Sequence, residues 1–323
     1  MHRIVWMLLL LPAITMAQGP QAAWKPERPV ELVIGAAPAG ANDRIGRAIQ
    51  RVLTESKIVS VPINAINKPG AGQTLAFAYL NTHPSNPHYL GLASSSWLTT
   101  IAAGRGSAGH KEFTPIVKIL DEYQVYFVRA DSPIKSARDI VEQLKKDPAS
   151  LSFGFSTAAG NPLHLSIATL ARQAGADPRK VKAVVFTTGT DTAIQVAGGH
   201  LDVGVQSPGS AQAMAEAGKI RIIAVGAPKR HPGALASVPT LREQGLEVDA
   251  NVFYTVFGPR GLTAAQTAYW DQAISQAMQS GEITKNVAQN YWTIGLIGHR
   301  DLPQFLDREI ENFRRVLSEM GLM

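Results

Sequence analysis

Short apolar runs alternate along the chain with segments whose apolar residues recur at helical spacing. A short apolar run bounded by turn formers is typical of a buried strand, and apolar residues at i, i+3, i+4 and i+7 are typical of an amphipathic helix. Strands that alternate with helices indicate an α/β fold with parallel sheets flanked by helices. The pattern predicts strands at residues 30–34, 61–65, 89–93, 125–128, 151–156, 183–186, 201–206, 220–225 and 253–257.

The helices between these runs have recognisable starts. Residues 45–53 carry an apolar stripe along one face, and Asn161 before Pro162 combines a good N-cap with proline at the first helical position. We expect residues 263–320 to be mostly helical and to end with a helix over residues 302–320.

The predicted strands are too numerous for one small sheet, which indicates two α/β lobes. We expect the chain to cross between the lobes near residues 125–128 and 253–257. This assigns residues 24–124 and 255–323 to lobe 1 and residues 125–254 to lobe 2.

The beginning of the chain has the pattern of a secretory signal peptide. A charged start at residues 1–3 precedes an almost wholly apolar run at residues 4–16, and the small residues Thr15 and Ala17 match a cleavage site. The run is shorter than the roughly 20 apolar residues of a membrane-spanning helix. We therefore expect residues 1–17 to be removed, a mature chain that begins near Gln18, and a periplasmic location.

Composition excludes several classes of protein. The absence of cysteine rules out disulfides, thiolate catalysis, zinc–sulfur sites and a lipidated N-terminal cysteine. The net charge of +6 comes from scattered residues, so nucleic acid is not an expected partner, although the charge would gently steer an anion. The chain has no Walker P-loop, HExxH or GxGxxG motif, and its histidines are dispersed. We expect no cofactor, no metal and no enzymatic activity.

The stretch GAAPAGANDRIGRAI, at residues 35–49, joins a predicted strand to a predicted helix. Its small residues leave backbone N–H groups accessible near a helix start, which suits an anion. Asp43 lies at that start, where an acidic side chain either complements the helix dipole or braces the loop so that its N–H groups face a ligand.

A second candidate loop follows the predicted strand at residues 151–156. Residues 154–158, GFSTA, come close to the nucleophile elbow of hydrolases, but Ala158 stands where that motif needs glycine. An exported serine hydrolase using Ser156 and His164 is therefore one alternative, although no third residue to orient His164 is identifiable. The other alternative is a loop at a strand end that binds a ligand.

Several motifs together resemble those of one protein family. They occur in family order as PVELVIGAAPAGANDRIGRAI, INKPGAGQ, EFTPIVKI, LSFGFSTAAGNPLHL, AGGHLDVGV, AGKIRIIAVGAPKRHPGALASVPTLREQGL and FYTVFGPRGLT. The sequence is similar, from about Trp24 to its end, to the Bug family, the periplasmic solute-binding proteins related to TctC of tripartite tricarboxylate transporters. The resemblance implies a type II periplasmic-binding-protein fold, with two α/β lobes around a ligand cleft and a two-strand hinge.

The resemblance also implies that backbone amides and ordered waters bind a small carboxylate. The family's two ligand loops fall on residues 36–43 and 156–165, with Asp43 as the brace of the first loop and Asn161 as the cap of the helix after the second. The ligand-binding residues implied are Ala36, Ala37, Ala39, Gly40, Ala41, Asp43, Ser94, Ser156, Thr157, Ala158, Gly160, Asn161, His164, Thr187, Thr188 and Gln206.

Some positions depart from the family pattern. Ala36, Ala37 and Ala39 replace Phe, Pro and Gly, which would reshape the pocket, and Thr187 stands where Lys or Arg is frequent. Trp97 follows a serine run at a position usually held by a smaller residue. We expect it either to stack on a flat ligand or to be a half-buried surface aromatic.

These inferences predict a monomeric periplasmic solute-binding protein. It would capture a di- or tricarboxylate, an aromatic acid or an acidic amino acid by hinge closure. The integral membrane subunits of a tripartite tricarboxylate-type transporter are its expected partners. A binding protein that feeds a sensor kinase is the alternative within the same class.

Overall fold

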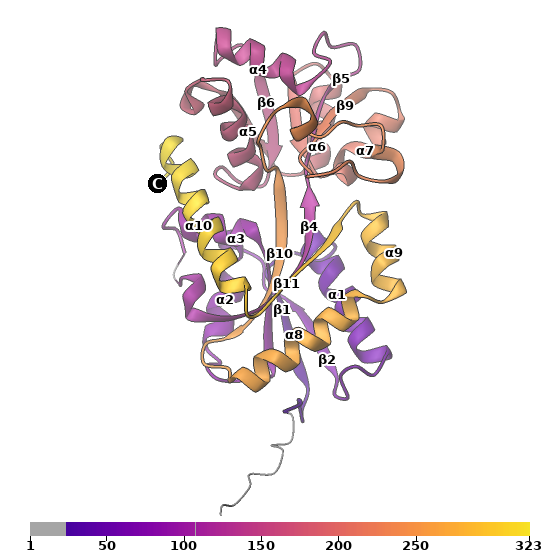
Figure 1. Ribbon diagram of the computed structural model, residues 1–323, viewed down its shortest axis with the longest axis vertical. Helices are drawn as coiled ribbons and strands as arrows, with labels where there is room; N and C mark the ends of the chain where they lie inside the picture. Colours follow the sequence, from indigo (N-terminus) through magenta and orange to yellow (C-terminus); the bar gives the residue numbers. More distant parts are fainter. Residues whose placement is uncertain (1–23, 107) are drawn as a thin grey trace, which may run out of the picture.

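The computed structural model describes residues 24–106 and 108–323 (Figure 1). The predicted signal peptide and its cleavage site lie outside these residues. In the described part of the chain, no helix is both long enough and apolar enough to cross a membrane.

Lobe 1 is built on a six-stranded sheet with the order β11-β4-β10-β3-β1-β2. Strands β1, β2 and β3 pair in parallel, whereas β10 is antiparallel to β3 and β4, and β11 is antiparallel to β4. The strands are β1 (Val30–Ile34), β2 (Ile63–Asn67), β3 (Tyr89–Ser94), β4 (Phe113–Tyr123), β10 (Asn251–Pro259) and β11 (Thr293–Gly298).

Lobe 2 is built on a five-stranded sheet with the order β7-β6-β8-β5-β9. Strand β6 is parallel to β7 and β8, while β5 is antiparallel to β8 and β9. Both sheets are therefore mixed, whereas the alternation of strands and helices predicted parallel sheets. The strands are β5 (Val125–Arg129), β6 (Ser152–Ser156), β7 (Lys182–Phe186), β8 (Val203–Gln206) and β9 (Ile220–Val225).

Helices cover both sheets, and the last helix runs along both lobes (Figure 1). Around lobe 1 lie α1 (Ala41–Glu55), α2 (Thr74–Asn81), α3 (Ser95–Ala102), α8 (Ala264–Met278) and α9 (Gly281–Gln289). Around lobe 2 lie α4 (Ala137–Lys146), α5 (Pro162–Gln173), α6 (Gly189–Ala197) and α7 (Pro208–Glu216). Helix α10 (Leu302–Glu319) contacts α3 of lobe 1 and α5 of lobe 2.

Two strands that the apolar pattern did not predict occupy one side of the first sheet. Strand β4 carries buried charged residues, among them Lys118 and Asp121, whose side chains pair at 2.6 Å. Strand β11 lies in a segment expected to be mostly helical, and its Gly295 backbone oxygen accepts a hydrogen bond from Lys118 Nζ. Strand β2 begins two residues later than expected, after Pro62. A search for apolar runs therefore missed β4 because of its charged residues and β11 because of its glycines.

The chain passes between the lobes at two adjacent points. Gln124 joins β4 to β5, and its backbone N–H donates to Ala250 O at 2.8 Å, just before β10. The expected crossing strand at residues 125–128 is β5, which pairs only within the second sheet. The limit expected between residues 254 and 255 falls within β10, whose residues all pair with β4 in the first sheet.

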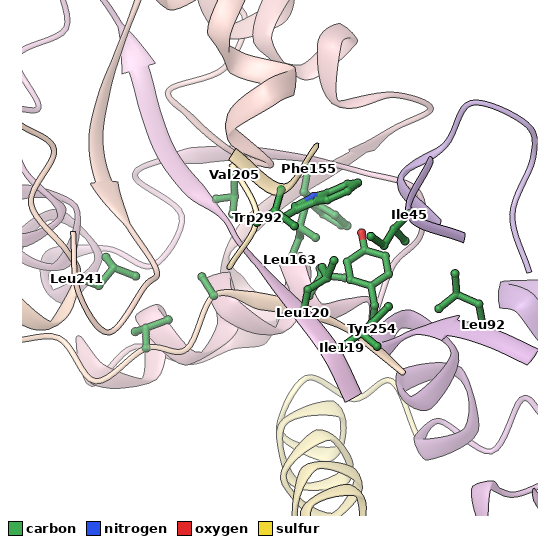
Figure 2. Close-up of a cluster of buried hydrophobic side chains, with 14 of the residues drawn as sticks. Ile45, Leu92, Ile119, Leu120, Phe155, Leu163, Val205, Leu241, Tyr254 and Trp292 are labelled. Carbon is green, nitrogen blue, oxygen red and sulfur yellow. The ribbon is translucent and has the colours of Figure 1, made fainter. Parts of the chain in front are cut away.

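One buried apolar cluster continues from lobe 1 into lobe 2 (Figure 2). It includes Ile45 and Tyr254 from lobe 1 together with Phe155 and Val205 from lobe 2, so the lobes pack on each other near the crossing points. Continuous apolar burial of this kind stabilises the relative position of the lobes.

Trp97 belongs to the core of lobe 1, which corrects both expectations for this residue. Its side chain is fully buried and stacks on Phe77 with ring centroids 3.6 Å apart. Phe113 and Phe257 pack against the same ring edge-on. Trp97 points from α3 into the core because burying the large apolar surface of an aromatic side chain is favourable.

Candidate ligand-binding site

A cavity of about 600 Å³ lies between loops of the two lobes. Lobe 1 contributes the loop after β1, the turn before α2 and the helix α3 with the turn that follows it. Lobe 2 contributes the loop between β6 and α5. The lining residues are Gly35, Ala36, Asn42, Gly70, Ala71, Gly72, Gln73, Ser94, Ser96, Thr99, Thr100, Ala103, Arg105, Thr157, Ala158, Ala159, Gly160 and Asn161.

Four helices begin at this cavity, namely α1, α2, α3 and α5. The N-cap residues of the first three, Gly40, Gln73 and Ser94, form no side-chain cap with the first turn of the helix. Elsewhere, helices such as α4 and α8 are capped by Ser136 and Thr263. The first N–H groups of a helix have no intrahelical partner and carry partial positive charge, so converging uncapped starts favour an anion.

The side chains that line the cavity add positive charge and no negative charge. Among the described residues, Arg105 is the one charged lining residue, and no Asp or Glu lines the cavity. Arg105 lies on the turn that ends α3, where Gly104 adopts a φ of 70° and the Arg105 N–H donates to Thr100 O at 3.1 Å. The electrostatics of the lining therefore agree with those of the helix starts.

Asp43 holds the first loop in place without lining the cavity. Its Oδ2 accepts a hydrogen bond from Ala39 N at 2.9 Å, and its Oδ1 accepts from Asn67 Nδ2 and Arg47 Nε at 2.8 Å each. Burial alone would raise the pKa of Asp43, but these hydrogen bonds and the Arg47 charge bring the pKa below its ordinary value. The carboxylate thus stays ionised and ties the loop to β2 and α1, which is the contact that a loop brace requires.

Gln73 links three parts of the cavity wall. Its Nε2 donates to Ser94 Oγ at 2.6 Å, while its Oε1 accepts from Asn42 Nδ2 and Ser94 N, both at 3.1 Å. These bonds connect the start of α2 to α1 and to the end of β3. Because both ends of the amide are engaged, the Gln73 side chain positions the wall.

Strained backbone conformations gather around the cavity. Ala39, Ala71, Gln73 and Thr157 all have positive φ, between 46° and 79°, although none is glycine. Such conformations cost free energy and persist only where surrounding contacts enforce them. Ala71, Gln73 and Thr157 line the cavity, so these strained conformations help to set the shape of the candidate site.

Ser156 and His164 do not form a nucleophile–base pair. Ser156 Oγ is buried and donates to Gln206 Oε1 at 3.0 Å. His164 Nδ1 accepts from Gly160 N at 3.1 Å, and its ring stacks on Phe155 with centroids 4.6 Å apart. Burial lowers the pKa of His164 to about 4, so the imidazole is neutral at pH 7. The pair therefore lacks the hydrogen bond that activates a serine nucleophile.

The structure divides the residues that the sequence singled out. Those that line the cavity are Ala36, Ser94, Thr157, Ala158, Gly160 and Asn161. Those that do not line it are Ala37, Ala39, Gly40, Ala41, Asp43, Ser156, His164, Thr187, Thr188 and Gln206.

Two of the residues that do not line the cavity have structural roles in lobe 2. Thr188 is exposed and caps α6, its Oγ1 accepting from Asp191 N at 3.1 Å. Gln206 is buried, and its Nε2 donates to Thr192 Oγ1 at 2.9 Å. Both residues therefore stabilise lobe 2 locally.

The sequence analysis did not predict two parts of the cavity wall, namely residues 70–73 and Arg105. Residues 69–72 were visible as a Pro-Gly-Ala-Gly turn before a helix, a signal that is weak by itself. Arg105 gave no signal, because a single exposed arginine after a glycine resembles any solvated helix end.

Comparisons with known proteins show a family likeness over most of the chain. The model of the tripartite tricarboxylate transporter family receptor matches residues 45–322. Protein BugT of Bordetella pertussis is 22% identical over 303 residues, which cover 92% of this chain and 90% of BugT.

Two solved structures share the fold. A TctC solute-binding protein from Polaromonas, solved without ligand, has a TM-score of 0.77 at 20% identity, covering 91% of this chain and 99% of that chain. An R. palustris protein solved with adipate has a TM-score of 0.74 at 22% identity, covering 92% and 98%. The chain belongs to the tripartite tricarboxylate transporter receptor family, the solute-binding proteins related to TctC and Bug.

Proposed function

We propose that this protein captures a small carboxylate in the periplasm and delivers it to the integral membrane subunits of a tripartite tricarboxylate-type transporter. One observation carries the proposal: uncapped starts of α1, α2 and α3 meet at a cavity that no described acidic side chain lines. A carboxylate there would accept hydrogen bonds from N–H groups that lack intrahelical partners. The related R. palustris protein, solved with adipate, supports this class of ligand.

The proposed capture step is closure of the two lobes. The cavity has walls from both lobes, so a ligand that contacts both would favour the closed arrangement. Gln124 and Ala250 lie side by side where the chain crosses, and rotation about these two points would move residues 125–249 against residues 24–123 and 251–323. We infer that the protein acts as a monomer and that the closed form is recognised by the membrane subunits.

A ligand screen on the mature protein tests the proposal. Thermal unfolding is followed with mono-, di- and tricarboxylates, aromatic acids and acidic amino acids, each beside its uncharged amide. A carboxylate present at about 100 times its Kd is expected to stabilise the protein by roughly 2.7 kcal/mol. The matched amide is expected to give a much smaller shift, because it lacks the negative charge that the helix starts favour.

Two results would contradict the proposal. If no carboxylate shifted the unfolding temperature, or if the amides shifted it equally, the site would not select anionic ligands.

Small-angle X-ray scattering tests closure separately, and a bound carboxylate is expected to reduce the radius of gyration. Hydrolysis of an ester that is lost in Ser156→Ala would favour an enzyme instead.

A further inference from the structure

Arg105 lines the cavity just after the end of α3, opposite to the start of that helix. Helix α3 begins after Ser94 and runs along the wall, and Ser96, Thr99, Thr100 and Ala103 line the cavity from successive turns. Eight helical residues span about 12 Å at 1.5 Å per residue. The start of α3 and Arg105 therefore offer two anion-binding groups that are separated along one helix.

The guanidinium of Arg105 is available for a ligand. Within residues 24–106 and 108–323, no side-chain hydrogen bond or ion pair of Arg105 is present, in contrast to Arg47, which pairs with Asp43 at 2.8 Å. The Arg105 residue is exposed. An arginine offers a planar set of N–H donors that matches a carboxylate in bidentate geometry.

The wall between the two ends is small and neutral. Alanines from both lobes, including Ala36, Ala103 and Ala158, alternate with the hydroxyls of Thr99 and Thr100. This lining fits an alkyl chain and offers no described carboxylate to an ammonium group. An amino acid would bring its positive charge beside Arg105 or the helix starts, which is unfavourable.

We infer that Arg105 binds a second carboxylate of the ligand, so that the site selects linear dicarboxylates over monocarboxylates and over acidic amino acids. The inference rests on the proposed function, because it needs a first carboxylate at the helix starts. Arg105 is then the residue that determines specificity within the class of small carboxylates.

Isothermal titration calorimetry at constant ionic strength tests the inference with adipate, hexanoate and glutamate. These probes compare a six-carbon chain with two carboxylates, the same chain with one, and a dicarboxylate with an ammonium group. The wild-type protein is expected to bind adipate at least tenfold more tightly than hexanoate or glutamate. Succinate, glutarate, pimelate and suberate then map the preferred spacing of the two carboxylates.

Arg105→Gln is the decisive variant. It is expected to weaken adipate binding about 10- to 100-fold and to leave hexanoate binding unchanged, with Arg105→Lys intermediate for adipate. Arg300→Gln removes the same charge from an exposed arginine that does not line the cavity, and it is the control for general electrostatic steering. Unchanged unfolding temperatures show that the variants are folded.

The possible failures are distinguishable. If wild type and Arg105→Gln both bound adipate and hexanoate equally well, the role of Arg105 would be wrong while carboxylate binding stood. An equal loss of affinity for adipate and hexanoate in Arg105→Gln would also overturn it, since the arginine would then act on the first carboxylate. If the wild type bound none of these acids, the proposed function itself would fail.

Discussion

The polar side chains at the starts of α1 and α2 are engaged with neighbouring protein groups, which leaves their backbone N–H groups facing the cavity. Asp43 accepts three hydrogen bonds, and Gln73 uses both ends of its amide on Asn42 and Ser94. A fully engaged side chain cannot turn towards a ligand without losing hydrogen bonds worth about 1 kcal/mol each. In the proposed function, the first carboxylate therefore depends on N–H groups whose positions these side chains maintain.

The variant Asp43→Asn tests whether the Asp43 carboxylate maintains the position of the loop. Three donors converge on the Asp43 carboxylate, so an amide NH2 group in its place would face at least one of them. We expect the free energy of unfolding to fall by about 1–3 kcal/mol and the affinity for adipate to fall with it, as measured by urea denaturation and calorimetry.

Asp139→Asn is the matched control. Asp139 also lies in the first turn of a helix, and its Oδ2 accepts from Lys135 N and Ser136 N at 2.7 and 3.0 Å, but it belongs to α4 and does not line the cavity. This variant is expected to lose stability and to keep its affinity for adipate. Unchanged adipate binding by Asp43→Asn would show that Asp43 does not brace the site.

At the scale of elements, the helices α1, α2 and α3 all start at the cavity, and none of the three starts has a side-chain cap. Helices α7 and α10 also lack side-chain caps, but each has a proline in its first turn, which removes one N–H that would need a partner. The three uncapped starts at the cavity contain no such proline. Apart from the N–H of Thr74 in α2, which donates to Ala71 O, their first N–H groups are concentrated without a cap where the two lobes face each other.

Adding a cap to α1 should compete with the ligand. Gly40 is the N-cap, with φ −67° and ψ 168°, a conformation that any residue adopts. In Gly40→Asp, the new carboxylate would occupy the first N–H groups and repel an anionic ligand, with an interaction of about 1–4 kcal/mol at 4 Å. We expect adipate affinity measured by calorimetry to fall at least tenfold.

Gly40→Asn separates charge from size, because it caps the helix with a neutral group of the same shape. A Cβ at this position would lie 3.2 Å from Ala37 O, a tight contact that both variants share. We expect Asn to weaken adipate binding less than Asp does. Equal affinities in the two variants would argue against electrostatic recognition at α1.

At the scale of the whole molecule, a buried carboxylate lies where the lobes join. Glu122 is the second-last residue of β4, and it accepts hydrogen bonds from Trp292 Nε1 at 2.9 Å and Tyr254 OH at 3.1 Å. Trp292 and Tyr254 both belong to the cluster that continues into lobe 2 (Figure 2). Burial raises the pKa of Glu122, although the hydrogen bonds from Trp292 and Tyr254 and the charge of Arg44 oppose this.

This raised pKa predicts a pH-dependent stability. Above the ordinary value of 4.5, the folded protein retains a proton that the unfolded chain has lost, so the contribution of Glu122 to the free energy of unfolding falls as pH rises. Glu122→Gln cannot titrate. Its stability relative to the wild type is therefore expected to rise with pH above 4.5, in urea denaturation at a series of pH values.

Glu142→Gln is the control, because Glu142 is an exposed residue on α4 that pairs with Lys145. It is expected to follow the wild-type pH dependence. A constant stability difference between Glu122→Gln and the wild type across the pH series would show that Glu122 does not titrate differently on folding.

The amino-acid pattern by itself determined the elements whose burial is apolar and local. Strands β1 and β9 have the predicted bounds, and Asn161 caps α5 as predicted, accepting from His164 N at 3.0 Å. Family motifs along the chain also determined the fold class and the type of protein. These features depend on short-range spacing and capping, which a sequence displays directly.

Only the tertiary structure decided which residues meet. Strand β4 is buried although it is charged, because Lys118 finds Asp121 and the Gly295 backbone of a strand far along the chain. Trp97 turns into the core because Phe77 and Phe257 surround it. Arg105 reaches the cavity because α3 runs along its wall. Each outcome depends on contacts between distant segments, and local sequence carries no record of such contacts.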